Sequence, residues 1–191
     1  MDIMDRRIYF EKADDAIRAA KHSLFKLELL DEYNASFEKS WKFFKRNGYV
    51  KQDLLFDELH DDLRQISQFK KMGIEFRRVH IVTLPLSEYL RFEIQDYITT
   101  QKMGEQIYFI ERKEFGKIAK PRGIRLIDLL RVDDLVFLTK YANVKGNVGG
   151  DLIGGFLIYE QAEVKKYKEY EKRILKKAVP MDKFLKRHQS T

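Results

Sequence analysis

The chain of 191 residues is 44% hydrophobic and 35% charged, which suits one folded domain over residues 1–191 and excludes a disordered chain. It has no cysteine, so disulfides, thiol catalysis and thiolate metal sites are excluded. There is no apolar run of about 20 residues and no apolar leader, so we expect no membrane span and a cytoplasmic location. The formal net charge of +7 favours anionic partners, although acidic residues are intermixed with the basic ones.

The first 72 residues show helical and extended patterns in turn. Apolar residues at helical spacing predict helices over residues 8–22, 36–46 and 52–72. An alternation of apolar and polar residues predicts a strand over residues 23–31. Each of these helices carries an apolar stripe, so each is expected to pack on a core.

The longest of these helices carries three side chains that could share a metal ion, Asp57, His60 and Asp61. Three potential ligands on one exposed helix, without a second cluster elsewhere, form a poor metal motif. An acidic, solvated helix face explains them better. We therefore expect neither a metal site nor a cofactor.

Residues 76–105 hold the most regular pattern in the chain. Residues 76–83 alternate as a half-buried strand, Pro85 suits the first turn of a helix, and Gly104 suits its end. At 100° per residue, Glu93 falls within the apolar stripe of this helix, whereas Asp96 falls towards water. A carboxylate on an apolar face must be paired, hydrogen-bonded or protonated, because burying it alone costs several kcal/mol.

Two interpretations of Glu93 remain open. In the first, it forms a structural ion pair with the strand, where Arg78 and His80 are the nearest cations, or it extends to the helix edge. In the second, Arg78, His80, Glu93 and Glu105 line a polar pocket that recognises an anion or a peptide terminus. Arg91 is a further candidate, although it lies about 160° from Glu93 around the helix.

The remaining strands are expected over residues 105–111, 135–141 and 152–159, the last two joined as a hairpin. Gly154 and Gly155 inside the last strand indicate a bulge or a close backbone approach, and so a surface that could face a peptide.

Two basic segments are candidates for phosphate contact. One is the stretch 113–125, expected as a loop or a short helical turn. The other is a charged helix over residues 162–178, the main part of a basic helical C-terminal segment 162–191. A solvated amphipathic helix explains the second segment as well. The residues that would contact nucleic acid are Lys117, Lys120, Arg122, Lys172, Arg173, Lys176 and Lys177.

The order of these motifs resembles an uncharacterised domain family common in actinomycete bacteria. The resemblance rests on the strand 78–82, on Pro-Leu-Ser-Glu-Tyr-Leu-Arg-Phe-Glu over residues 85–93, on Gly104-Glu105 and on the segment 128–134. Leu130 departs from the pattern, where an aromatic residue is expected. The resemblance implies no known activity. It implies a companion of helix-turn-helix transcription regulators, and it draws attention to Arg91 and Glu93.

Together these patterns predict a single α+β domain with a mixed, largely antiparallel sheet of about five or six strands and helices mainly on one face. The leading functional hypothesis is a non-enzymatic regulatory or accessory protein that binds a protein, a peptide or a small anion through the polar patch around Arg78, His80 and Glu93. A nucleic-acid-binding protein is the alternative. The third hypothesis is a hydrolase or nuclease that uses His80 and Glu93, but two titratable groups are too few for a mechanism.

Overall fold

The computed structural model describes residues 2–188. Its strands are β1 (Asp2–Asp5), β2 (Ser23–Glu28), β3 (Glu75–Val82), β4 (Gln106–Glu111), β5 (Leu129–Val132), β6 (Leu135–Ala142), β7 (Asp151–Ile158) and β8 (Val179–Pro180). Its helices are α1 (Arg6–Arg18), α2 (Lys39–Asn47), α3 (Gln52–Met72), α4 (Glu88–Met103), α5 (Arg112–Phe115), α6 (Gln161–Lys177) and α7 (Met181–His188). Within this range, no helix has the length and apolar character needed to cross a membrane.

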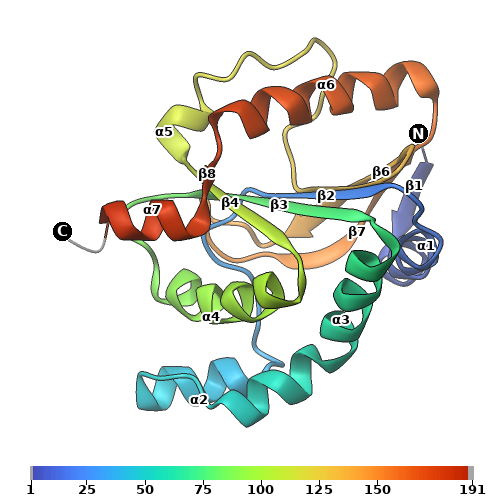
Figure 1. Ribbon diagram of the computed structural model, residues 1–191. Coiled ribbons are helices and arrows are strands. Elements are labelled where there is room, and N and C mark those ends of the chain that lie inside the picture. Colours follow the sequence, from blue (N-terminus) through green and yellow to red (C-terminus); the bar gives the residue numbers. More distant parts are fainter. Residues whose placement is uncertain (1, 189–191) are drawn as a thin grey trace.

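The eight strands of the described chain form one sheet in the order β1-β7-β6-β5-β2-β3-β4-β8 (Figure 1). β2, β3 and β4 are parallel to one another, and every other neighbouring pair is antiparallel. The prediction of a mixed, largely antiparallel sheet is confirmed. The expected number of strands is too low, because the edge strands β1 and β8 have only four and two residues and show no alternating pattern.

Helices cover both faces of the sheet. In Figure 1, α5 and α6 lie above the sheet and α3 and α4 lie below it, with α2 beneath α4. On the upper face, Val164, Tyr167 and Ile174 of α6 belong to one buried cluster with Phe25 and Val79 of the sheet. The expectation of helices mainly on one face therefore needs correction, because the strongly charged α6 also closes a core of its own.

The helix of the central unit begins later than its sequence predicts. α4 starts at Glu88 instead of Pro85, and Ser87 is its N-cap. The Ser87 hydroxyl accepts a hydrogen bond from the backbone N–H of Leu90 at 3.0 Å, which satisfies one of the free donors of the first turn. Gly104 ends the helix as expected.

The two glycines of β7 allow a close backbone approach, as their sequence indicates. A Cβ at Gly154 would lie 2.1 Å from the carbonyl oxygen of Met4, and one at Gly155 would lie 2.3 Å from that of Leu138. The approaching backbones belong to β1 and β6, the neighbours of β7 in the sheet. These glycines therefore serve the sheet itself and do not mark a surface for a peptide.

A buried ion pair attaches α6 to the sheet. Arg131 of β5 donates to both carboxylate oxygens of Glu171 of α6, at 2.6 and 2.9 Å. The two side chains are only 4% and 7% exposed. Arg77 of β3 lies 3.4 Å from the same carboxylate. Removing one partner of such a pair leaves an uncompensated buried charge.

We expect Glu171→Ala to lower the free energy of unfolding by about 3–5 kcal/mol, because it strands the Arg131 guanidinium inside the protein. Urea unfolding followed by circular dichroism measures this loss. Glu169→Ala, at an exposed position of the same helix, is the matched control and should cost less than about 1 kcal/mol. Equal losses in the two variants would contradict the assignment.

Candidate functional site

Two parallel strands place charged side chains in neighbouring rows on the face covered by α4. In the register of β2 and β3, Lys26 lies opposite Arg78 and Glu28 lies opposite His80. Because side chains alternate along each strand, Phe25 of β2 and Val79 of β3 point instead to the face covered by α6. The parallel pairing therefore creates a polar cluster on one side of the sheet.

Arg78 is held by two carboxylates in this cluster. Its Nε donates to Glu105 at 2.7 Å, and its Nη1 donates to Glu28 at 3.1 Å. Lys26 adds a second cation, with Nζ 2.6 Å from the Glu28 carboxylate. Burial opposes ionisation of Glu28, but Arg78 and Lys26 outweigh it and hold the pKa of Glu28 below its usual range. Glu28 is therefore an ionised, paired carboxylate.

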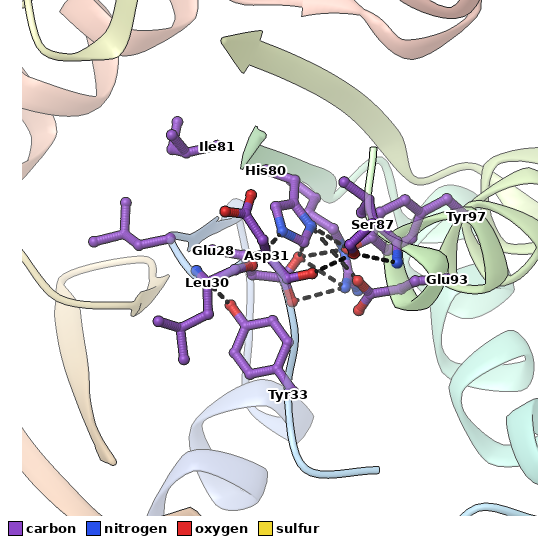
Figure 2. Close-up of polar contacts among 12 residues, drawn as sticks. Glu28, Leu30, Asp31, Tyr33, His80, Ile81, Ser87, Glu93 and Tyr97 are labelled. Atoms are coloured by element: carbon purple, nitrogen blue, oxygen red, sulfur yellow. Dashed lines mark hydrogen bonds and ion pairs between the residues drawn. The ribbon is translucent and has the colours of Figure 1, made fainter. Parts of the chain in front are cut away.

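His80 lies at the centre of the cluster and is fully buried (Figure 2). Its Nε2 lies 2.7 Å from the carbonyl oxygen of Leu30 and must carry a hydrogen, because a carbonyl only accepts. Its Nδ1 lies 2.7 Å from the hydroxyl of Tyr97, which is also 2.8 Å from Glu28. Burial lowers the pKa of His80, and Glu28 opposes this effect. A neutral His80 directs the Nδ1 lone pair towards Tyr97 and the carboxylates.

Glu93 reaches the same cluster from α4, where Figure 2 shows it close to His80 and Tyr97. The residue is 8% exposed, and its Oε2 lies 3.7 Å from Nδ1 of His80. This oxygen is buried without a hydrogen-bond partner. Burial, and next the charge of Glu28, raise the pKa of Glu93 well above its usual range. Arg78, its expected ion-pair partner, is engaged by Glu28 and Glu105 instead.

A cavity of about 460 Å³ adjoins the cluster on the face covered by α1, α3 and α4. Its wall includes Glu93 and Asp96 of α4, together with Lys26 and Arg78 of the sheet. Asp96 was expected to face water, but its Oδ1 is buried and without a partner, because α3 packs across α4 there. Burial, and next the charge of Glu38, raise the pKa of Asp96 to about 8.

The structure brings Arg78, His80, Glu93 and Glu105 together, but it buries the last three and leaves the Arg78 side chain only 14% exposed, so they form no surface patch. Arg91 is exposed and donates to the carbonyl of Leu86 at 3.4 Å, outside the cluster. Three residues of the cluster and of the cavity wall were not predicted from the sequence. These are Glu28, Tyr97 and Asp96.

The sequence held only weak signals for these residues. The strand alternation of Lys26 and Glu28 was visible, but the parallel register that sets them beside Arg78 and His80 was not. Asp96 lies one helical turn after Glu93, so the two side chains are neighbours on α4. This spacing indicates a buried acidic pair only when the packing of α3 against α4 is known.

The basic residues gather in a second region. Lys172, Arg173, Lys176 and Lys177 are exposed on α6. The Arg173 guanidinium donates to the carbonyl of Ala119 at 2.8 Å, so α6 and the stretch 113–125 lie side by side. A cleft of about 800 Å³ next to this stretch is lined by Arg112, Arg125 and Lys140. Lys120 and Arg122 are exposed, and Lys117 pairs with Glu114 at 2.6 Å.

The fold and the buried cluster define a mixed α+β domain with a polar interior site. The chain belongs to the family described as Domain of unknown function (DUF6879), whose model matches residues 11–186. The prediction of an uncharacterised domain family is thereby confirmed. No curated protein matches the chain in sequence.

Solved structures with a similar fold include NucT from Helicobacter pylori. It has a TM-score of 0.52 and 12% sequence identity, and the match covers 94% of this chain and 98% of that chain. Another is TrmBL2, described as an archaeal chromatin protein with a novel mode of DNA binding. It has a TM-score of 0.48 and 13% identity over 91% of this chain and 50% of that chain. At these identities the likeness to NucT shows the fold alone, and the likeness to TrmBL2 carries no argument.

We expect Asp96 to make stability depend on pH in a defined direction. Its folded-state pKa of about 8 lies above the ordinary value of 3.8, so the folded chain holds this proton more tightly than the unfolded chain. Wild-type stability should therefore fall as pH rises from about 4 to about 8. Asp96→Asn removes this contribution and should be more stable than wild type at about pH 8, by on the order of 2 kcal/mol.

Urea unfolding of both proteins across this pH range provides the measurement. The difference in unfolding free energy should be close to zero near pH 4 and should grow with pH. A difference that stays constant with pH would show that Asp96 is not held protonated.

Proposed function

We propose that this chain is a non-enzymatic binding protein, regulatory or accessory in role, that holds a small polar ligand in the cavity beside β3 and α4. One observation carries the proposal. Glu93 and Asp96 lie one turn apart on α4, line the same cavity, and each have a buried carboxylate oxygen without a hydrogen-bond partner. A buried acceptor left unpaired costs about 1–3 kcal/mol, so groups that donate to both oxygens would bind favourably.

The chemistry of the cavity wall selects a class of ligand. Its unpaired groups are acceptors, whereas its cations are engaged, because Arg78 and Lys26 contact Glu28 and Glu105. A ligand must therefore present hydrogen-bond donors, as amines, amino sugars and polyols do. An ammonium group would also favour the ionised form of Glu93 that burial disfavours. This wall suits a small anion less well than the sequence alone suggested.

The size of the cavity also favours a small molecule. Ligand pockets commonly span about 300–1,000 Å³, and this cavity of about 460 Å³ lies within that range. A protein partner such as a helix-turn-helix regulator, and a cytoplasmic location, stay predictions. A hydrolase or nuclease would need an accessible His80, but His80 is fully buried and its Nε2 donates to the backbone carbonyl of Leu30.

We expect Glu93→Gln and Asp96→Asn each to weaken ligand binding by about tenfold or more, because each replaces a carboxyl oxygen that accepts from the ligand with an NH2 group that only donates, at a cost of about 1–3 kcal/mol. A thermal-shift screen of amines, amino sugars and polyols identifies a ligand, and calorimetry measures its affinity for each variant. Glu169→Gln is the matched control, since Glu169 is exposed on α6, which covers the opposite face. A ligand bound equally by all variants, or the lack of any hit, would contradict the proposal.

Nucleic-acid binding is a second candidate function, supported by a different observation. The contact between Arg173 and Ala119 joins the basic residues of α6 to the basic stretch 113–125 as one cationic surface. A cleft of about 800 Å³, lined by Arg125 and Lys140, adjoins that surface. Phosphate contacts by such residues supply affinity that is independent of sequence and sensitive to salt.

For this second candidate we expect affinity for a labelled oligonucleotide to fall at least about tenfold between about 50 and 200 mM salt. Replacing Lys172, Arg173, Lys176 and Lys177 by glutamine should abolish binding in a fluorescence anisotropy assay. The matched control replaces the same number of exposed cations on α2, which are Lys39, Lys42, Lys45 and Arg46. Equal losses in the two quadruple variants would indicate a response to net charge alone and would reject the α6 surface.

A further inference from the structure

Three side chains of the buried cluster direct metal-ligand atoms towards one another. A carboxylate oxygen of Glu28, a ring nitrogen of His80 and a carboxylate oxygen of Glu93 all lie within 4.8 Å of one another. Nδ1 of His80 lies 3.6 Å from Oε2 of Glu28 and 3.7 Å from Oε2 of Glu93. Ligand atoms bound at about 2.0–2.2 Å to one tetrahedral ion are about 3.3–3.6 Å apart. We propose that Glu28, His80 and Glu93 bind one divalent transition-metal ion, of which zinc is the representative.

The orientation of His80 supports the site. Its Nε2 is fixed by the carbonyl of Leu30 at 2.7 Å, which leaves Nδ1 as the nitrogen that faces the two carboxylates. Metal-binding histidines commonly donate their other N–H to a backbone carbonyl in this way, which fixes the tautomer and the orientation of the ring.

The unpaired oxygen of Glu93 is an independent indication that a cation belongs here. Oε2 is buried and has no hydrogen-bond partner, although it faces the centre of the triad. The nearby cations do not fill this need, because Arg78 contacts Glu28 and Glu105, and Lys26 contacts Glu28. A divalent ion between His80 and Glu93 would supply the missing partner, and it would replace the contacts that the Tyr97 hydroxyl makes with Nδ1 of His80 and with Glu28.

The ligand set indicates the class of ion. One imidazole and two carboxylates suit zinc and its first-row neighbours, whereas magnesium and calcium prefer oxygen alone. Three protein ligands leave at least one position open, as in metal sites that receive a further ligand. Glu93 also lines the cavity, so a group of the bound ligand would occupy that position. This inference rests on the proposed function, because it names what the ligand would meet in that cavity.

Calorimetry with zinc, on the full chain stripped with a chelator and dialysed, tests the site. The wild type should bind one ion per chain, and Glu93→Gln should bind it at least about 100-fold more weakly. Asp96→Asn is the control, because Asp96 lies on the same helix and the same cavity but outside the triad. It should bind zinc with wild-type affinity. Lack of zinc binding by the wild type, or equal affinity in Glu93→Gln, would overturn the inference.

A second readout does not depend on any variant. Cobalt(II) added to the stripped wild type should show the visible absorption of a low-coordinate imidazole–carboxylate site, and zinc should remove it. A spectrum identical to that of aqueous cobalt would also overturn the inference, even if Glu93→Gln failed to fold.

The two proposals fail in different ways. The donor-rich ligand of the proposed function requires both Glu93 and Asp96, whereas zinc requires Glu93 but not Asp96. If no zinc binds but both variants lose the small ligand, the proposed function stands and the metal inference is wrong. If zinc binding follows the expected pattern while no small ligand is found, the metal inference stands and the proposed function is wrong.

Discussion

The cost of burying charge between the sheet and α4 is the constraint on which the rest of this structure depends. Moving a carboxylate out of water costs several kcal/mol unless a partner replaces the lost hydration. The parallel pair β2 and β3 meets this cost by setting Lys26 and Arg78 beside Glu28, and Glu105, the residue before β4, contacts Arg78 as well. On the opposite face, Arg131 and Glu171 solve the same problem between β5 and α6. The Arg131–Glu171 pair attaches α6 to the sheet, whereas the pairs of Lys26 and Arg78 lie within the sheet and at the residue before β4.

The same constraint explains why two buried carboxyl oxygens of the interior site have no hydrogen-bond partner. The cations of the sheet are taken up by Glu28 and Glu105, so nothing in the described chain pairs by hydrogen bond with Oε2 of Glu93 or Oδ1 of Asp96. Both oxygens lie on α4 and border one cavity. Unpaired buried acceptors of this kind are costly, and proteins tend to retain such local conflicts at functional sites. The proposed ligand would supply partners to both oxygens, and the proposed metal ion would supply one to Glu93.

Much of the fold could be predicted from the sequence, because helix periodicity and glycine stops are local signals. The expected helix over residues 52–72 coincides with α3, and Gly73 caps it in the left-handed conformation. Glu93 was placed correctly on the apolar face of its helix. The edge strands were not predictable, because β1 and β8 are held by pairing with distant strands and not by their own pattern.

The site was only half predictable, for a related reason. Arg78, His80 and Glu93 stand out in a single stretch of chain, but Glu28 joins them from a strand 50 residues away in sequence from Arg78. That contact follows from the parallel register, which no local pattern reveals. Of the two cations expected beside Glu93, Arg78 is engaged by Glu28 and Glu105. The other, His80, lies 3.7 Å from Oε2 of Glu93, but burial lowers its pKa.

The most direct test of this account is the free energy of unfolding of Glu93→Gln at pH 7, measured beside the wild type in urea. A carboxylate that is unpaired in the folded protein contributes no ion pair to stability, so the variant should lie within about 1 kcal/mol of wild type or above it. A loss of about 3 kcal/mol or more would contradict the account. It would show that Glu93 forms a structural ion pair and that the cluster exists for stability alone.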